Sequence, residues 1–517
     1  MSGYAWLIPL LPLLAATLIA VSYLFAGNRG EAGERLTASI ALAAAGLSTL
    51  LVLALDLQAL ASGAPGQIEL FQWLSAGEYR VSISFTLDTL GLSMTTLVSA
   101  LSLLTLKFSV NYMHREAGFQ RFFIILSLFM GAMQLIVMGG SVAMVFIGWE
   151  LAGVSSYLLI GYALERPTAT GNASRAFITN RIGDAGFVLV IFLSFHWLGG
   201  IDWLTITEGA GKLETLSAGL LGAGFLLAAL VKSAQVPFTP WITRALEGPT
   251  PSSAIFYGSL MVHAGVYLVI RLEPVFQQAP AMMVLLVLFG LLSVLYGWLC
   301  GLVQTDVKSA LMFSTTAQVG LMFTACGLGL FELAAWHLAL HAIWRAYQFL
   351  HAPALMHLVS RAARPAPAWL QRNRWLHTAA LQRFWLDQLA DWLLVRPTRN
   401  LARDTRDFDE QIVSRIVGLP SQVSAISSLA EWQQRKKRGY ISVEGDLGRG
   451  RGVLGHLMEW LASLLHWFEE HLVLQSSGEG VSGFIRKLGR YVQQVEILLA
   501  QPRYLMLLIM ATFVVIL

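Results

Sequence analysis

The chain has 517 residues, of which 56% are hydrophobic and 13% are charged. Soluble domains carry about 25% charged residues, so the composition excludes an ordinary water-soluble protein and indicates an integral membrane protein. The formal net charge of +4 is small, so membrane lipid is the expected surrounding and no nucleic acid is expected as a partner.

Apolar runs long enough to cross a hydrocarbon core of roughly 30 Å recur along the chain as far as Met356. They predict an all-α polytopic membrane protein of about twelve transmembrane helices. The first run has no basic leader, so it is expected to be an anchor rather than a cleaved signal peptide. The expected helices are 4–25, 37–56, 88–112, 121–138, 141–162, 174–197, 216–245, 251–272, 280–303, 307–328 and 331–356, followed by a last short one at 504–517.

The segment between the second and third helices, Glu69 to Asp88, alternates apolar and polar residues around Gly77 and predicts a small β-hairpin on the membrane surface. Basic residues collect in alternate loops between the helices, which predicts an amino terminus on the outside. These residues are Arg29, Arg35, Arg115, Arg121, Arg166, Arg175, Arg244 and Lys308.

The character of the chain changes after Met356, where many of its Lys and Arg residues occur. We therefore expect three parts: a transmembrane domain at 1–356, a basic cytoplasmic segment at 357–501 and a C-terminal transmembrane helix at 502–517. Within the basic segment, 384–401 and 454–474 are amphipathic, and they are expected to lie along the membrane or against a partner. The glycine-rich stretch 439–452 is typical of a linker.

Glu150 interrupts an apolar run in the middle of an expected helix. A charged carboxylate at that depth costs about 3 kcal/mol on insertion scales unless another helix supplies a partner, so Glu150 is a candidate for ion transport. A structural ion pair or a neutral carboxyl is the alternative.

Lys232 is the expected partner of Glu150. It ends a long apolar run, and Pro237 and Pro240 interrupt the helix after it. Burial disfavours the charged form of a lysine and a nearby carboxylate favours it, so a change in the distance between them would make Lys232 bind or release a proton. A broken helix also frees carbonyls that can hold water. The alternative is a lysine that snorkels from a helix end.

His337, His341 and Arg345 are spaced by four and share one face of the helix 331–356. Histidine titrates near neutrality, so the pair suits a proton relay. A metal site is disfavoured because a third ligand is missing from the motif and Arg345 would repel a cation. Structural hydrogen bonding is the remaining alternative.

Four other ionisable residues in or near the expected helices each have a structural as well as a functional interpretation. Lys308 lies near a helix start, where snorkelling competes with a place in the proton path. His263 could link the lysine to the histidines or be a satisfied core residue. Arg181 and Asp184 flank Gly183 and are expected to form a structural pair rather than a conducting one.

The two cysteines, Cys300 and Cys326, lie inside apolar runs, which argues against disulfides and against cysteine-rich metal or iron-sulfur sites. No cofactor is therefore expected in this chain.

Several segments of the chain together resemble the proton-conducting antiporter-like subunits of respiratory complex I and of Mrp-type cation antiporters, above all the L-subunit type of complex I. The resemblance covers about residues 70–356, and residues 486–517 resemble the final helix of that family after its lateral amphipathic segment. The segments that carry it are Gly148-Trp149-Glu150, Ser155 to Gly161, Asn180 to Asp184, Lys232 to Pro237, Gly248 to Ala254 and Leu302 to Lys308.

The resemblance implies an antiporter-like fold with a broken helix near Pro237, in which the residues matching Glu150 and Lys232 form a coupling pair. The residues matching Lys308, His337 and His341 would continue a hydrated path. Two positions depart from the family, because Tyr257 stands where histidine is usual and Arg345 where lysine is usual. Arginine hardly deprotonates, so a proton cannot hop through it as through lysine.

The family's helices beyond the histidine helix, one of which carries a lysine for the outer half-channel, have no recognisable counterpart after Met356. The shortened pattern is similar to the membrane subunit of two-component DAB inorganic-carbon uptake systems. That resemblance implies a proton-conducting subunit of the bacterial inner membrane that is not itself an enzyme. Its partner would be a large soluble, zinc-containing, carbonic-anhydrase-like subunit.

Two other functions stay open. One is a truncated antiporter-like proton-pumping subunit of a respiratory NADH dehydrogenase or membrane hydrogenase complex. The other is a scaffold whose buried charges are static.

Overall fold

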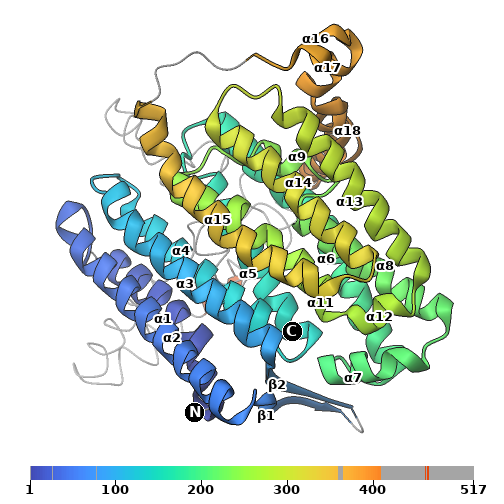
Figure 1. Ribbon diagram of the computed structural model, residues 1–517. Coiled ribbons are helices and arrows are strands. Elements are labelled where there is room, and N and C mark those ends of the chain that lie inside the picture. The colour runs from blue at the N-terminus through green and yellow to red at the C-terminus, as the bar shows by residue number, and fades with distance from the viewer. Residues whose placement is uncertain are drawn as a thin grey trace, which may run out of the picture. The chain divides into compact units, whose positions relative to one another are not determined.

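The computed structural model describes residues 2–25, 27–76, 79–358 and 365–408, together with residues 460, 461, 463 and 464 (Figure 1). The chain divides into two compact units, Met1–Thr398 and Arg399–Leu517. The predicted last helix at 504–517 and the linker at 439–452 lie outside the described residues, as does most of the amphipathic stretch 454–474.

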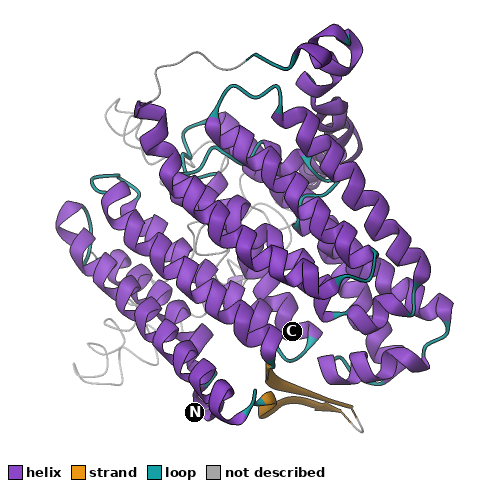
Figure 2. Cartoon of the chain, in the orientation of Figure 1, coloured by secondary structure: helices purple, strands orange, loops and turns teal. Residues whose placement is uncertain are grey.

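The first unit is a bundle of long helices (Figure 2). Ten helices of the described chain are long and apolar enough to cross a membrane, which confirms the predicted all-α polytopic membrane fold. They are α1 (Leu7–Leu24), α2 (Glu34–Ser62), α3 (Thr89–Tyr112), α4 (Phe119–Met138), α5 (Val142–Ile160), α6 (Pro167–Leu198), α8 (Thr215–Lys232), the composite helix Thr250–Arg271, α13 (Pro280–Gly301) and α14 (Val307–Gly327). The expected helix at 331–356 is present as α15 (Phe331–Leu358).

Glycines allow the helices α13 and α14 to pack closely. A Cβ built on Gly290 would lie 2.4 Å from Thr324 Oγ1 and 2.6 Å from the carbonyl oxygen of Gly320, both on α14. Lipid tails are as apolar as the helices, so helices in a membrane associate by close packing and not by the hydrophobic effect. Small residues at the crossing allow the backbones to approach closely enough for this packing.

We expect Gly290→Leu to destabilise the protein by roughly 1 to 3 kcal/mol or more, because the new side chain would have to push the two helices apart. Gly219→Leu is the matched control, since a Cβ at Gly219 would meet nothing within 4 Å. The thermal unfolding midpoint of each variant in detergent tests the prediction. Equal midpoints for the two variants would contradict it.

Two of the expected helices are interrupted. The helix expected at 216–245 ends at Lys232 and resumes as the short α9 (Pro240–Thr243), as the two prolines predict. The helix expected at 251–272 is also interrupted, and no proline lies at the break. It consists of α10 (Thr250–Ser253), a π-helical turn at Ala254–Ser259, a 3₁₀ turn at Met261–His263 and α11 (Ala264–Arg271).

The two faces of the bundle differ. Ion pairs join consecutive basic loops, with Arg115 Nε 3.0 Å from Glu31 and Arg166 Nη2 2.9 Å from Glu247, so these loops lie on a common face as their alternation predicts. The opposite face carries the predicted hairpin, in which β1 (Gly66–Ala76) pairs antiparallel with β2 (Tyr79–Leu87). The short helices α7 (Trp203–Gly209) and α12 (Glu273–Gln277) lie near the hairpin (Figure 1). We call this second side the hairpin face.

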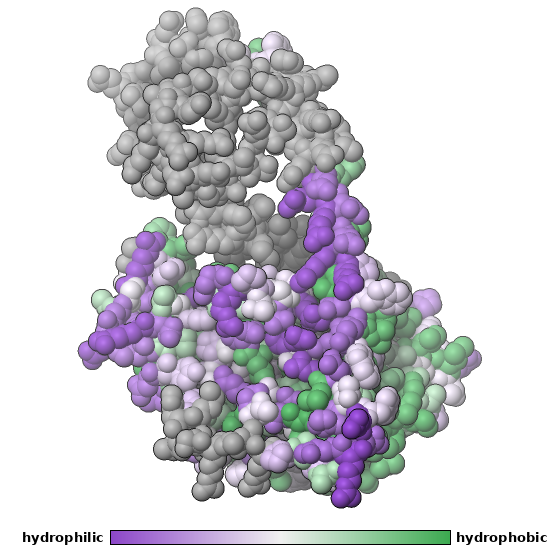
Figure 3. Space-filling model, turned by 90° about the horizontal axis from the view of Figure 1, so that it is seen from above, coloured by the Kyte–Doolittle hydropathy of each residue, from purple (hydrophilic) through white to green (hydrophobic). Residues whose placement is uncertain are grey.

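Short helices follow α15 and pack on the loop face of the bundle. Viewed from above, hydrophilic residues cover much of the described part of this face (Figure 3). Asp387 is buried there and accepts hydrogen bonds from Arg244 Nε at 3.0 Å and from Arg383 Nη1 at 3.2 Å. Arg175 contacts the carboxylate of Asp391 through Nη1 and Nη2. The helices are α16 (Ala368–Arg372), α17 (Arg374–Leu381), α18 (Leu386–Ala390) and the π-helical turn Asp391–Val395. The next helix in the chain, α19 (Arg396–Phe408), belongs largely to the second unit.

Candidate functional site

Lys232 is buried at the carboxyl end of α8, with 1% of its surface exposed. Its Nζ donates a hydrogen bond to the carbonyl oxygen of Trp149 at 2.9 Å and lies 4.8 Å from the centre of the Trp149 ring. The partial negative charge at a helix C-terminus adds to these contacts. The hydrogen bond of the amine is therefore to a neutral acceptor, and no ion pair within the described residues joins it directly to a carboxylate.

A second basic group, Arg181 on α6, holds the two carboxylates near Lys232. Arg181 Nη1 lies 2.5 Å from Glu150 Oε2, and its Nη2 lies 2.8 Å from Asp184 Oδ2. Its guanidinium also stacks over the ring of Phe177 at 4.6 Å. The predicted contact between Arg181 and Asp184 is present, but the predicted direct partner of Glu150 is wrong, because Arg181 and not Lys232 takes that place.

Lys232 remains within the field of both acids, and the four groups form a cluster of two positive and two negative charges. The cluster surrounds Gly153, one turn after Glu150, where a Cβ would lie 3.6 Å from Lys232 Nζ and 3.7 Å from Arg181 Nη2. We call Glu150, Arg181, Asp184 and Lys232 the charge cluster. Glu150 Oε1 and Asp184 Oδ1 are buried and have no hydrogen-bond partner among the described residues, which is typical of sites that bind water.

The histidines form a second group, the histidine cluster, on α15 and at the start of α11. His263 Nε2 lies 2.9 Å from His341 Nδ1, and Arg345 Nε donates to His341 Nε2 at 3.4 Å. His337 Nε2 lies 2.9 Å from Gln318 Oε1, and Arg345 Nη2 donates to Ser314 Oγ at 2.9 Å. The spacing of four on one helix face therefore predicted correctly that His341 and Arg345 meet.

The contacts of the histidine cluster determine where its protons lie. Arginine can only donate, so His341 Nε2 must accept, and a neutral His341 carries its proton on Nδ1 and donates it to His263 Nε2. A neutral His263 then carries its own proton on Nδ1. That atom is buried and has no hydrogen-bond partner among the described residues. The pair is therefore a directed hydrogen-bonded chain with a free donor at the His263 end.

The two clusters approach each other where α11 packs against α8. A Cβ on Gly265 would lie 2.3 Å from Ser233 Oγ and 2.3 Å from the carbonyl oxygen of Ala229, so only glycine fits between the two helices. Ser233 follows Lys232 directly, and its buried hydroxyl, like His263 Nδ1, has no hydrogen-bond partner in the part of the chain that the structure describes. Ordered water is expected at unpaired buried donors and acceptors such as Ser233 Oγ and His263 Nδ1.

Not every predicted residue joins these clusters. Lys308 lies half-buried in the first turn of α14, next to the N-cap Asp306, and no described contact connects it to the histidines. Tyr257 is buried in the π-helical turn beside Trp241, whose Nε1 donates to the carbonyl oxygen of Val231. The sequence analysis did not identify Ser314 and Gln318 as partners of the histidine cluster. Polar residues in an otherwise apolar helix could have indicated such a role.

No group of three metal-ligating side chains comes together within the part of the chain that the structure describes. Cys300 and Cys326 are both buried and free.

Two family models match the chain. Residues 139–364 match the model for "NADH:quinone oxidoreductase/Mrp antiporter, TM", and residues 73–123 match that for "NADH-Ubiquinone oxidoreductase (complex I), chain 5 N-terminus". The two matches together cover more than half of the 517 residues.

Curated relatives and solved structures agree with the models. NADH-quinone oxidoreductase subunit L of Mycobacterium tuberculosis is 36% identical over 358 residues, which is 68% of this chain and 56% of that protein. NAD(P)H-quinone oxidoreductase chain 5 of Synechocystis is 34% identical over 360 residues, or 68% of this chain and 53% of the relative. The chain thus spans about half the length of these relatives.

The Mrp complex of Dietzia has the same fold at 23% identity, with a TM-score of 0.59 over 68% of this chain and 38% of its own. A membrane-bound sulfane sulfur reductase, an archaeal respiratory complex, is 16% identical with a TM-score of 0.57 over 69% of this chain and 57% of its own. Fold, charged residues and relatives agree, and the chain belongs to the family of antiporter-like membrane subunits of the complex I and Mrp type.

Proposed function

We propose that this chain is the proton-conducting subunit of a multisubunit membrane complex. The observation that carries the proposal is the buried Lys232, whose contacts among the described residues are the carbonyl and ring of Trp149, beside a carboxylate-arginine cluster. Protons would pass between the charge cluster and the histidine cluster through water near Ser233. The proposed path comprises Glu150, Lys232, His263, His341, His337 and Lys308, with Arg345 as a fixed charge.

The charge cluster suggests how Lys232 would change its protonation. Arg181 and Lys232 compete for the same two carboxylates, and in this structure Arg181 holds both. A shift of Glu150 or Asp184 toward Lys232 would favour the protonated amine, and their return to Arg181 would favour release of the proton. Arg181 would thereby be the cation that competes with Lys232 for Glu150, and Asp184 would be a second carboxylate for which both compete.

The names of the relatives support a respiratory-type complex as the partner. The relatives aligned over two thirds of the chain are quinone oxidoreductase subunits, and one solved structure of the same fold is a respiratory sulfur reductase. In such a complex the chain would conduct protons in response to electron transfer in other subunits.

Inorganic-carbon uptake is the second candidate, and it rests on the chain's departure from the family after residue 364. There the match ends, and the described chain continues to α19 (Arg396–Phe408), which carries four arginines and two aspartates, in place of further matched sequence. Helix α19 presents exposed basic side chains to which a soluble zinc-containing subunit of carbonic-anhydrase type could bind. Both candidates imply a bacterial inner membrane, with the basic loops in the cytoplasm and the amino terminus outside.

Purification of the tagged full chain from its native membrane tests the two candidates. A respiratory partner predicts co-purifying quinone-reductase or hydrogenase subunits with iron-sulfur clusters. A carbon-uptake partner predicts a large soluble zinc protein and, when both genes are expressed, growth in air of a host that lacks carbonic anhydrase. Purification of the chain alone from membranes that retain proton transport would contradict a multisubunit complex.

A further inference from the structure

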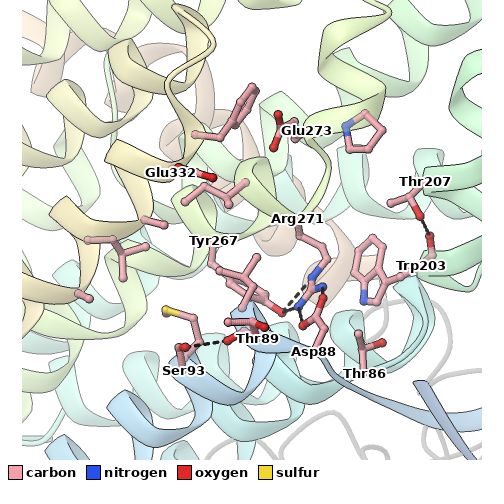
Figure 4. Close-up of a pocket in the computed structure, with 18 of the residues that line it drawn as sticks. Thr86, Asp88, Thr89, Ser93, Trp203, Thr207, Tyr267, Arg271, Glu273 and Glu332 are labelled. Carbon is pink, nitrogen blue, oxygen red and sulfur yellow. Dashed lines mark hydrogen bonds and ion pairs between the residues drawn. The ribbon is translucent and has the colours of Figure 1, made fainter. Parts of the chain in front are cut away.

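A large cavity opens on the hairpin face, away from both clusters described above. Its volume is about 860 Å³, and it is enclosed by the end of β2, the starts of α3 and α15, and the helices α7, α11 and α12 (Figure 4). This is the face opposite the basic loops. The polar side chains that matter for its chemistry are Thr86, Asp88, Tyr267, Arg271, Glu273 and Glu332.

An ion pair forms one wall of the cavity. Arg271 is buried and donates to both carboxylate oxygens of Asp88, with its Nη2 at 2.9 Å from Oδ1, whereas 42% of the Asp88 side chain is exposed. Arg271 Nη2 also donates to the Tyr267 hydroxyl at 3.0 Å. Gly91 leaves room for this contact, since a Cβ there would lie 3.3 Å from Arg271 Nη2.

The wall connects to the histidine cluster along one helix face. His263, Tyr267 and Arg271 are spaced by four, so their side chains follow one another on the same side of α11, about 6 Å apart along the axis. A row of polar groups therefore runs from the His263–His341 pair to the Asp88–Arg271 pair and the cavity.

The cavity carries excess negative charge. Asp88 and Arg271 neutralise each other, and within the described residues no basic side chain pairs with Glu273 or Glu332. Burial, and then the negative charge of the nearby Glu332, raise the pKa of Glu273. A concave surface of one charge sign attracts the opposite ion and raises its local concentration.

A buried hydroxyl lies in the wall of the cavity. Thr86 is only 8% exposed and lines the cavity, yet its Oγ1 has no hydrogen-bond partner among the described residues. A buried hydroxyl without a partner costs about 1 to 3 kcal/mol, and a hydrogen bond to a water molecule in the cavity would remove this cost.

We propose that this cavity is an aqueous vestibule that collects hydrated cations from the solution on the hairpin face and through which the histidine cluster exchanges protons with that solution. The Asp88–Arg271 pair separates the vestibule from His263. The exchange of protons with the histidine cluster rests on the proposed proton conduction. The collection of hydrated cations in a water-filled cavity does not depend on it. Only O–H and N–H bonds are made and broken along such a path.

Thiol labelling of single-cysteine probes in the full chain, within its native complex, tests the vestibule. The native cysteines are buried and give little background. Thr86→Cys probes the interior of the cavity, Leu204→Cys probes its exposed rim, and Ser99→Cys is the buried control on α3 that does not line it. If Thr86→Cys fails to assemble, Ser93→Cys replaces it, since Ser93 also lines the cavity.

We expect membrane-impermeant thiosulfonates to label Thr86→Cys and Leu204→Cys from the same side of sealed vesicles, and to leave Ser99→Cys unlabelled. Relative to the ratio of the two rates with a free thiol in solution, the cationic reagent should be favoured over the anionic one roughly tenfold at Thr86→Cys, and Glu273→Gln with Glu332→Gln should abolish this preference. A labelled rim with an unlabelled Thr86→Cys would overturn the vestibule, and an unchanged preference would overturn the role of the two glutamates. Labelling as expected in a complex that transports no protons would reject only the proposed function.

Discussion

Replacing Lys232 with Ala is expected to abolish proton transport by the complex, with a loss of roughly 100-fold or more, as for removal of an essential proton-transfer group. The amine lies in the field of both carboxylates without an ion pair to either among the described residues, and the neighbouring Arg181 cannot release a proton in its place. Proton uptake into sealed vesicles measures the effect. With a carbonic-anhydrase-like partner, growth in air of a carbonic-anhydrase-deficient host that carries both components would be lost as well.

Lys212→Ala is the matched control for this variant. Lys212 is exposed in a short turn before α8, and removal of its charge should leave proton uptake unchanged. Each variant must first be shown to assemble at the wild-type level. An assembled Lys232→Ala complex with normal proton uptake would remove Lys232 from the mechanism. If Glu150→Gln is normal as well, the buried charges are a static scaffold.

Replacing Arg181 with Ala is expected to destabilise the protein by about 3 kcal/mol, the lower end of the range for breaking a buried ion pair. The variant leaves Glu150 and Asp184 without their common partner, and two carboxylates in an apolar interior repel each other. The lower end of the range applies because 38% of the Arg181 side chain is exposed. The thermal unfolding midpoint in detergent measures the loss.

Arg166→Ala provides the control for a pair of the same chemistry. Arg166 contacts Glu247 at 2.9 Å, but 55% of its side chain is exposed, and such pairs contribute less than about 1 kcal/mol. Arg181→Lys should recover part of the loss, since lysine can reach one carboxylate but cannot span both. Equal midpoints for Arg181→Ala and Arg166→Ala would show that the charge cluster does not stabilise the fold.

The hydrophobic pattern of the sequence was sufficient to predict the membrane fold and the depth of its ionisable residues. A span is recognised from some twenty consecutive residues, so its position is a local property of the chain. The same locality predicted the break after Lys232, because a proline removes its own backbone donor wherever it occurs. The hairpin around Gly77 and the alternation of basic loops followed in the same way.

The tertiary structure decided which ionisable groups meet. Glu150 lies within reach of two basic residues, and only the packing of α5 against α6, and of α6 against α8, shows that Arg181 and not Lys232 contacts it. The π-helical turn at Ala254–Ser259 likewise carries no proline to announce it.

The sequence by itself therefore determined that acids and bases are buried in a helical membrane bundle. Only the tertiary structure decided their partners, the direction of the His263–His341 hydrogen bond and the cavity beside Asp88 and Arg271. The physical reason is that burial depends on the hydrophobicity of neighbouring residues in the chain, whereas an ion pair depends on distances of a few ångströms between side chains on different helices. Those distances are set by how the helices pack.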